Sequence, residues 1–418
     1  MELGEAKRLA LGLVSPLEAE SVRLEAALGR VLAEDVASGF DLPGEARSRL
    51  DGYALKSADT TGTRSGNPVS LAVLDGTIAA GHSPEQRVGP GECVRILTGA
   101  PMPEGADAVV PQEDVEKASG RLLIKRPVSG GIVSAGEDAR KGGTLLHEGD
   151  LLTPSRLAVL AAVGRTDVCV HRKPRVALLA TGDEVREVGE SLHGPLTHCN
   201  NRLLLGWLAT IHGAEAIHLG IAVDDPKAVR ERLSGVEADI IVTTGGIGRG
   251  DRDCVLEAWR GMGVELHFRE INLTPGKNSA LGSKEGRVHL ALPGNPWGAQ
   301  VVFEELAAPL IRRMQGLKAV DGPSVAAVLE RPLKKREGFY KAERGALDGS
   351  RLPPVFVPSR RHGPVLADIR DGFAYILLEP HVVEVAAGSA VRVRFHDFPL
   401  LATASMGSGD DPGGVSEG

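Results

Sequence analysis

A run of apolar residues that favour β-strands stops abruptly at a glycine-rich loop in the middle of this chain. Residues 239–254 read DIIVTTGGIGRGDRDC, so the strand-forming residues lead into glycines and then into aspartates. Glycine lets a backbone approach a ligand closely, and the N–H groups that open a following helix face whatever lies there. The aspartates would repel a bare phosphate, so a divalent cation or a protonated group must lie between them and the ligand. The stretch predicts an α/β fold whose anion pocket includes a metal.

Two more loops of this kind follow apolar strands. Residues 181–184 (TGDE) end a strand that we predict over 175–180, and residues 292–296 (LPGNP) follow another strand and open a helix. Between them, apolar strands alternate with helices, which is typical of a parallel sheet covered on both faces. Ligands bind such sheets at the carboxyl ends of the strands. We therefore expect all three loops to lie at one edge of the sheet.

The rest of the chain has a different sequence pattern. Residues 36–150 are short alternating runs broken by glycine and proline, as in a small β domain, and residues 323–398 return to this pattern. The tail from residue 402 is rich in Gly, Ser and Asp, and we expect it to be disordered. Helical spacing predicts further helices over residues 5–14, 15–30 and 151–163.

Composition excludes several classes of protein. With 418 residues the chain is too long for a single core. A net charge of -7 and 3% aromatic residues give no support to binding of nucleic acid or of anionic membranes. No apolar run approaches a membrane span and the first residues show no signal-peptide pattern, so we expect a cytoplasmic protein. The four cysteines form no CxxC pair, which suggests neither a zinc site nor a disulfide framework.

Eight short motifs, taken together, resemble a known family. They are RLDGYA (49–54), RILTGA (95–100), GADAVV (105–110), GED (136–138), TGDE (181–184), TGG (244–246), PGK (275–277) and LPGNP (292–296). Their order over residues 5–398 is that of the molybdopterin molybdenumtransferases, the MoeA and gephyrin E-domain type. The glycine-pair and PGNP loops also recur in molybdopterin adenylyltransferases.

The resemblance implies a multidomain α/β plus β fold. A central parallel α/β domain would be flanked by a helical and extended domain, a small β domain and a C-terminal β-barrel-like domain. It implies an elongated homodimer, in which the β domain of one subunit meets the α/β and C-terminal domains of the other. The expected boundaries are 1–35 with 139–172 (helical and extended, dimerisation), 36–138 (inserted small β), 173–318 (α/β, molybdopterin-binding), 319–400 (C-terminal β) and 401–418 (disordered tail).

The resemblance also implies a reaction. Such a protein takes adenylylated molybdopterin from a molybdopterin adenylyltransferase upstream, releases AMP, and inserts molybdate, or tungstate, to form molybdenum cofactor. Asp51 and Thr98 would act from the β domain, and Glu184 and Asp253 would hold Mg²⁺ or orient the nucleophile. Lys277 would neutralise phosphate or molybdate. The remaining substrate-binding residues would be Gly245, Gly246, Arg249, Gly250, Pro293, Gly294 and Asn295.

Each of these side chains also has a purely structural reading. Asp51 could shape an Asp-Gly turn, and Thr98 could end a strand. Glu184 could cap a helix or pair with a lysine, and Asp253 could favour a helix dipole. Lys277 could be a solvated surface charge.

Two residues near the loops favour the structural reading. Cys254 would be a small buried hydrophobe. His198 would be structural or solvated.

The chain departs from the family pattern inside its site motifs. The residues that differ are Ser48–Arg49–Leu50, Gly248–Arg249–Gly250, His198–Cys199, Thr274 with Asn278, Trp297–Gly298 and Ser359–Arg360–Arg361–His362. Several hydroxyls, a carboxylate and a basic residue are lost, and the guanidinium groups of Arg249, Arg360 and Arg361 could restore positive charge. Two alternatives to the transferase therefore stay open. One is a divergent paralogue that binds cofactor or a partner protein as a carrier or scaffold, and the other, which the long flanking domains oppose, is adenylyl transfer.

Overall fold

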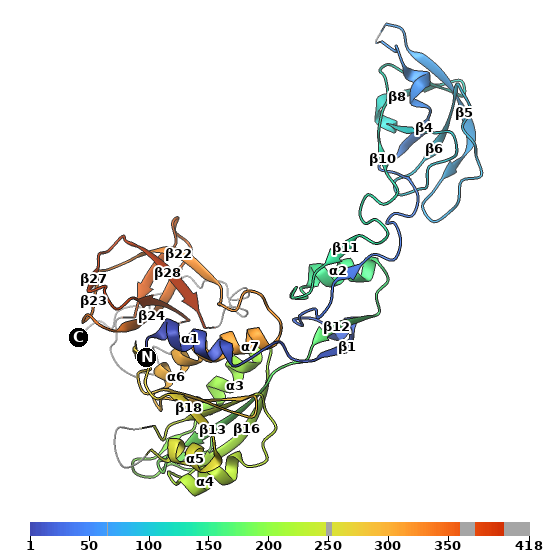
Figure 1. Ribbon diagram of the computed structural model, residues 1–418. Coiled ribbons are helices and arrows are strands. Elements are labelled where there is room, and N and C mark those ends of the chain that lie inside the picture. Colours follow the sequence, from blue (N-terminus) through green and yellow to red (C-terminus); the bar gives the residue numbers. More distant parts are fainter. Residues whose placement is uncertain (65, 248–252, 360–372, 397–418) are drawn as a thin grey trace.

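The computed structural model is elongated (Figure 1). A sheet covered by helices and the all-β unit that contains β22 and β28 lie together at one end. Another β unit, which contains β4 and β6, lies at the far end of a narrow middle section. The structure describes residues 1–64, 66–247, 253–359 and 373–396. The candidates Arg249, Gly250, Arg360 and Arg361 and the tail from 402 lie outside the described residues.

The central sheet has six strands in the order β16-β13-β17-β21-β20-β18. The first four are parallel to one another, as predicted, whereas β20 runs antiparallel to both of its neighbours, β21 and β18. The parallel prediction is therefore wrong at this edge, because only Glu285 and Gly286, both at positive φ, join β20 to β21. A two-residue turn can connect only antiparallel strands. The bounds are β13 (Arg175–Thr181), β16 (Glu215–Ala222), β17 (Ile240–Thr244), β18 (Glu265–Phe268), β20 (Ala280–Lys284) and β21 (Arg287–Leu292).

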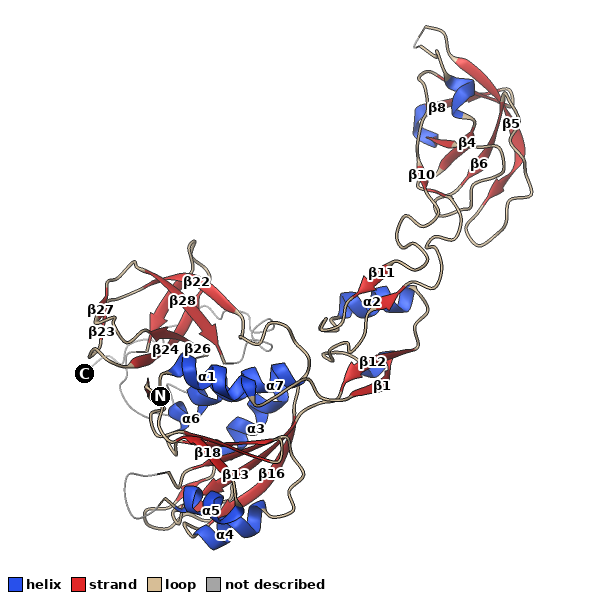
Figure 2. Ribbon diagram, viewed as in Figure 1, coloured by secondary structure: helices blue, strands red, loops and turns tan. Residues whose placement is uncertain are grey.

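Helices cover both faces of this sheet (Figure 2). Val176 and Leu178 of β13 pack into one core, and Ala177 and Leu179 pack into another, as the alternation of side chains along a strand requires. The first face carries α1 (Leu3–Gly12), α3 (Asn201–Ile211), α6 (Pro296–Val302), the π-helix Phe303–Ala307 and α7 (Ala308–Met314). The second carries α4 (Pro226–Leu233) and α5 (Cys254–Met262).

Side-chain caps fix the starts of three helices. The Asp225 carboxylate accepts from the Ala228 N–H at 3.0 Å, and the Asn295 amide oxygen accepts from the Gly298 N–H at 3.2 Å. Thr153 accepts from the Arg156 N–H at 3.4 Å and so begins α2 (Pro154–Ala162). A proline occupies the first position of each helix.

The helix expected over residues 15–30 is wrong. Residues 19–23 form β1 (Ala19–Arg23), which pairs antiparallel with β12 (Asp167–His171), and a 3-10 turn follows at Leu24–Ala26. Val22 and Leu24 pack on the core that contains Leu160 of α2. The local pattern fitted a helix, but a partner strand more than 140 residues away decides the outcome.

The far unit contains a six-stranded sheet in the order β7-β4-β6-β5-β9-β8. Its strands are β4 (Gly52–Leu55), β5 (Val69–Ile78), β6 (Glu92–Ile96), β7 (Ala108–Pro111), β8 (Val115–Ala118) and β9 (Arg121–Ile124), with 3-10 turns at Ser57–Thr60 and Gln112–Asp114. Short pairs join it to the middle section: β2 (Val36–Ala37) with β11 (Thr144–Leu146), and β3 (Arg47–Ser48) with β10 (Ile132–Val133).

The C-terminal unit is a closed five-stranded barrel. The barrel closes because β24 pairs with both β25 and β26, which confirms the expected barrel-like domain. Its strands are β22 (Ser324–Leu329), β24 (Tyr340–Asp348), β25 (Val355–Pro358), β26 (Ala374–Leu378) and β28 (Ala390–Phe395), with a side pair of β23 (Leu333–Lys334) and β27 (Glu384–Val385). The short β19 (Leu273–Thr274) pairs with β24 and so joins the barrel to the α/β unit. Throughout the described ranges, no helix is long and apolar enough to cross a membrane.

Candidate functional site

Three loops meet at one edge of the central sheet, as the sequence predicted. They follow β13, β17 and β21, which are neighbours in the parallel part of the sheet. The Gly245 N–H donates to the Leu292 carbonyl at 3.2 Å, and a Cβ added to Gly294 would lie 3.8 Å from Gly245 Cα. The glycine pair and the PGNP loop are therefore in contact.

Gly245 and Gly246 are required by packing between the loops. Both have positive φ, 86° and 64°. A Cβ on Gly245 would lie 2.5 Å from the Thr181 carbonyl oxygen, and one on Gly246 would lie 2.8 Å from Cys254 Sγ. No side chain fits at either position, so glycine is required at both.

A group of carboxylates lies at the same edge. Asp183 and Glu184 follow β13, and the pair β14 (Val185–Arg186) and β15 (Thr197–His198) holds the chain after them. The Asp224 N–H donates to Asp183 Oδ1 at 3.1 Å. Burial, and then the negative charges of Asp183 and Glu184, raise the pKa of Asp224.

Asp224 is not among the residues that the sequence motifs predict for the site. It follows β16 and precedes the cap of α4, so a carboxylate at the end of a predicted strand was the signal available. The Cys254 thiol donates to Asp224 Oδ1 at 3.7 Å, which places Asp224 beside the start of α5. Asp224 thus lies between the carboxylates of one loop and the helix that begins after Asp253.

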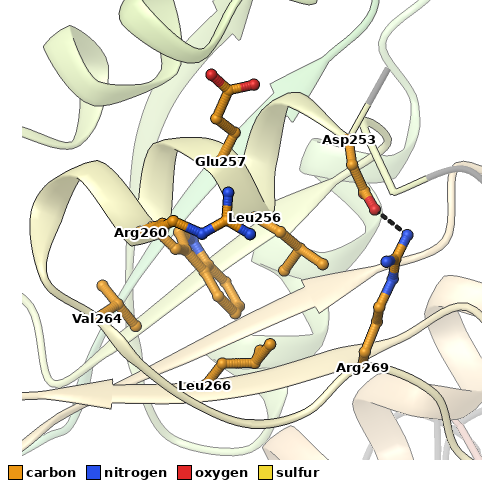
Figure 3. A pocket seen from close by; sticks show the side chains of 8 residues that line it. Asp253, Leu256, Glu257, Arg260, Val264, Leu266 and Arg269 are labelled. Atoms are coloured by element: carbon orange, nitrogen blue, oxygen red, sulfur yellow. Dashed lines mark hydrogen bonds and ion pairs between the residues drawn. The ribbon is translucent and has the colours of Figure 1, made fainter. Parts of the chain in front are cut away.

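Asp253 directly precedes Cys254 and lines a pocket (Figure 3). Its Oδ2 accepts from the Arg269 guanidinium, whereas its Oδ1 is buried and has no hydrogen-bond partner within the part of the chain that the structure describes. Burial raises the pKa of Asp253, and Arg269 opposes this shift. The pocket measures about 370 Å³ and is lined by Asp253, Leu256, Glu257, Trp259, Arg260, Val264, Leu266 and Arg269.

These oxygens suit a hard cation such as Mg²⁺. Crowded carboxylates beside Asp224 and an unpartnered oxygen on Asp253 are donors that a divalent cation satisfies. Among the described residues, no group of three or more His, Cys, Asp or Glu side chains forms a ready-made cage. The site therefore fits a cation that completes its coordination with water and with the oxygens of a ligand, as Mg²⁺ commonly does.

Lys277 lies on the loop after β19, close to the barrel. Its carbonyl accepts from the N–H groups of Ile271 at 3.1 Å and Ser279 at 2.9 Å, which fixes the backbone. Its ammonium lies 3.5 Å from Glu270 Oε2. The predicted role of Lys277 toward an anion stays a prediction, and in this structure the side chain already has a carboxylate partner.

The PGNP loop uses its polar groups locally. The side chain of Asn295 caps α6, and the Asn201 amide donates to the Gly294 carbonyl at 2.7 Å. Asn201 begins α3, is buried, and its Oδ1 has no partner within the described ranges. No sequence motif marks Asn201, although it directly follows the divergent His198–Cys199–Asn200 segment.

Asp51 and Thr98 lie together in the far β unit. Asp51 Oδ1 accepts from the Thr98 N–H at 2.7 Å and from the Thr98 hydroxyl at 2.8 Å. First the backbone bond and then the hydroxyl bond hold the pKa of Asp51 below its ordinary value. The Thr98 hydroxyl proton is thus donated to Asp51, so a donor role of Thr98 toward an anion would require this bond to exchange.

One chain does not bring these two groups to the carboxylates of the α/β unit. Asp51 precedes β4 and Thr98 follows β6, and both strands lie at the far end of the molecule from β13 and α5 (Figure 1). The predicted site residues therefore form two separate sets in a single chain.

Cys254 and His198 have structural surroundings. Burial, followed by the Asp224 charge, raises the pKa of the Cys254 thiol to about 12, so it remains protonated at neutral pH. A ring nitrogen of His198 lies 2.9 Å from the Glu190 carbonyl oxygen.

The chain matches two family models. One is described as the MoeA N-terminal region (domain I and II) and matches residues 1–164. The other is described as a probable molybdopterin binding domain and matches residues 177–313.

Curated relatives and solved structures agree with these matches. A molybdopterin molybdenumtransferase from Nostoc sp. is 36% identical over 73% of this chain and 71% of its own length. Molybdopterin molybdenumtransferase 2 from Mycobacterium tuberculosis is 32% identical over 93% of this chain and 98% of its own length. The crystal structure of a molybdopterin biosynthesis MoeA protein from Pyrococcus horikoshii has a TM-score of 0.80 and 29% identity, covering 95% of this chain and 99% of that one.

Proposed function

This chain belongs to the molybdopterin molybdenumtransferase family, and from that premise we propose that it inserts molybdenum into molybdopterin during molybdenum cofactor biosynthesis. The observation that carries the proposal is the meeting of three strand-end loops with a group of carboxylates at one sheet edge. The substrates are adenylylated molybdopterin and molybdate, or tungstate, and AMP leaves. A molybdopterin adenylyltransferase would supply the first substrate.

The residues of the α/β unit bind and orient the substrate in this proposal. The backbone N–H groups at the start of α5 face the anionic part of the substrate. Lys277 adds positive charge, and Glu184, Asp224 and Asp253 hold Mg²⁺. When bound, Mg²⁺ neutralises pyrophosphate charge as the phosphoanhydride bond is cleaved.

Asp51 and Thr98 contribute from the β unit. The Thr98 bonds lower the pKa of Asp51, so the carboxylate is ionised at neutral pH and oriented. An ionised, oriented carboxylate can align a water molecule or accept its proton. These roles require a second chain, because the two sets of residues lie at opposite ends of one chain.

This separation supports a homodimer. Its interface would lie on the helical and extended part formed by residues 1–35 and 139–172. Exposed apolar side chains there support this assignment, namely Leu28 (60% exposed), Leu151 (37%) and Val159 (42%). We assign the other parts as 36–138 (inserted β), 173–318 (α/β) and 319–400 (C-terminal β).

The carrier or scaffold alternative is not favoured. The cited curated relatives are named transferases, and this chain spans 71% and 98% of their lengths. Three carboxylates gathered at one sheet edge are also costly to maintain unless a cation uses them.

The experiment that tests the proposal is AMP release from adenylylated molybdopterin with Mg²⁺, with and without molybdate or tungstate. We expect oxyanion-stimulated release that Asp51→Asn and Glu184→Gln each abolish. Tight substrate binding without AMP would reject the transferase and favour the carrier.

A further inference from the structure

A two-residue segment after β18, Arg269 and Glu270, contacts two of the charged residues that the α/β site offers to its ligands, Asp253 and Lys277. The Arg269 guanidinium donates to Asp253 Oδ2, as Figure 3 shows, and Glu270 Oε2 lies 3.5 Å from Lys277 Nζ. Asp253 and Lys277 therefore each meet a side chain of opposite sign, and the two partners are adjacent in the sequence.

The backbone of this segment is fixed on both sides. Phe268 is 6% exposed and Ile271 is 1% exposed, so Arg269 and Glu270 stand between two anchored apolar residues. The Ile271 N–H donates to the Lys277 carbonyl at 3.1 Å. The Asn272 N–H donates to the Met1 carbonyl at 2.8 Å. The backbone is therefore held in place on both sides of Arg269 and Glu270.

Both ion pairs can exchange with a ligand. The side chains of Arg269 and Asp253 are 51% and 18% exposed, and those of Lys277 and Glu270 are 41% and 37% exposed. Ion pairs with this exposure are weak, because water solvates the separated charges well. Asp253 also keeps Oδ1 buried and without a hydrogen-bond partner among the described residues, so a cation that replaces Arg269 would satisfy an oxygen that Arg269 leaves unpaired.

We infer that Arg269 and Glu270 form a counter-ion clamp, a pair of positioning residues that holds Asp253 and Lys277 oriented until the ligands replace them. Mg²⁺ takes the place of the Arg269 guanidinium at Asp253. A phosphate or oxyanion takes the place of the Glu270 carboxylate at Lys277. The inference rests on the proposed function for the identity of these ligands, and no bond is made or broken.

The clamp makes a quantitative prediction for binding. Arg269→Gln removes the competitor of Mg²⁺, so the Kd for Mg²⁺ should fall about two- to fivefold, the worth of a partly exposed ion pair. Glu270→Gln should lower the Kd for inorganic pyrophosphate at saturating Mg²⁺ by a similar factor. Isothermal titration of the full-length chain measures both constants.

Matched controls separate the clamp from a general change in charge. Arg351→Gln breaks a similar pair, Arg351 Nε to Asp348 Oδ2 at 3.0 Å, and Glu384→Gln breaks Lys334 to Glu384 at 3.3 Å. Both pairs lie in the C-terminal unit, and neither change should alter either Kd. Arg269→Lys keeps the charge and should leave the Mg²⁺ affinity close to that of the wild type.

The result that overturns the clamp is an unchanged or weaker Mg²⁺ affinity in folded Arg269→Gln, or an equal gain in Arg351→Gln. If Arg269→Gln does not fold, Arg269→Met keeps the aliphatic packing and carries the same prediction. Failure of the proposed function gives a different result. A wild-type chain that releases no AMP would reject the transferase, whatever the Kd values of the variants are. AMP release with unchanged variant affinities would reject the clamp alone.

Discussion

The carboxylate of Asp51 in the β unit and that of Asp224 in the α/β unit have opposite electrostatic surroundings. Asp51 is exposed and receives two hydrogen bonds from Thr98, which lower its pKa. Asp224 is partly buried beside Asp183 and Glu184, which raise its pKa. The protein thus stabilises the charge of the Asp51 carboxylate with its own hydrogen bonds. It leaves the negative charge around Asp224 to be neutralised by a bound cation.

The prediction with the largest expected effect tests whether the β unit of one chain and the α/β unit of a second chain act on the same substrate molecule. Asp51→Asn and Glu184→Gln should each be inactive as homodimers. A heterodimer of the two variants, purified through different tags, contains one intact composite site and should recover about half of the wild-type AMP release per dimer. No recovery in the purified heterodimer would show that the two residues do not share a site between chains.

The second prediction compares a glycine from each region. A Cβ on Gly246 would lie 2.7 Å from Thr181 Oγ1 and 2.8 Å from Cys254 Sγ, whereas one on Gly99 would meet only Ala80 Cβ, at 3.8 Å. Both glycines have positive φ, so alanine costs about 1 kcal/mol at either position. The clash should add about 1–3 kcal/mol at Gly246. Urea unfolding of Gly246→Ala and Gly99→Ala measures the difference, and equal losses would contradict the packing argument.

The third prediction concerns the pH dependence set by Asp51. Its lowered pKa keeps the carboxylate ionised to a lower pH than usual, and the ionised form is lost as pH falls through the folded-state pKa. Thr98→Val removes the hydroxyl bond but keeps the backbone bond, so the acid limb of AMP release should move to higher pH. Thr98→Ser should restore the wild-type limb. An acid limb that stays in place in Thr98→Val would remove Asp51 as the titrating group.

The smallest expected effect concerns the crowding at Asp224. The pKa of Asp224 is raised in the folded state, so ionising Asp224 destabilises the fold once the pH exceeds its pKa in the unfolded state. The full loss of stability is present above its pKa in the folded state. Without Mg²⁺ at neutral pH, Asp224→Asn should raise stability by about 0.5 kcal/mol, a value discounted for solvent screening. Thermal unfolding with and without Mg²⁺ measures this, with the exposed Asp75→Asn as control. A loss of stability in Asp224→Asn would mean that the crowding is already compensated.

Much of the α/β unit could be predicted from the sequence, because its determinants are local. Apolar runs, glycine stops, and the caps Asp225 and Asn295 all act within a few residues. The site loops followed from the rule that parallel strands end at one sheet edge.

What could not be predicted depends on partners far away in the chain. Residues 19–23 form a strand because residues 167–171 pair with them. Asp224 becomes part of the site only because β16 lies beside β13. The partners Arg269 and Glu270 had no signal, since nothing in the sequence says which charges will face Asp253 and Lys277.

The narrow middle section has a consequence for how much protein a reaction needs. It holds Asp51 and Thr98 away from the carboxylates of the same chain (Figure 1). If the working site is shared between two chains, a solitary chain carries only half-sites, and the number of working sites follows mass action. The specific activity should then fall on dilution, once the concentration drops below the dissociation constant of the dimer. The amount of this protein, and not only its state of folding, would determine how many working sites exist.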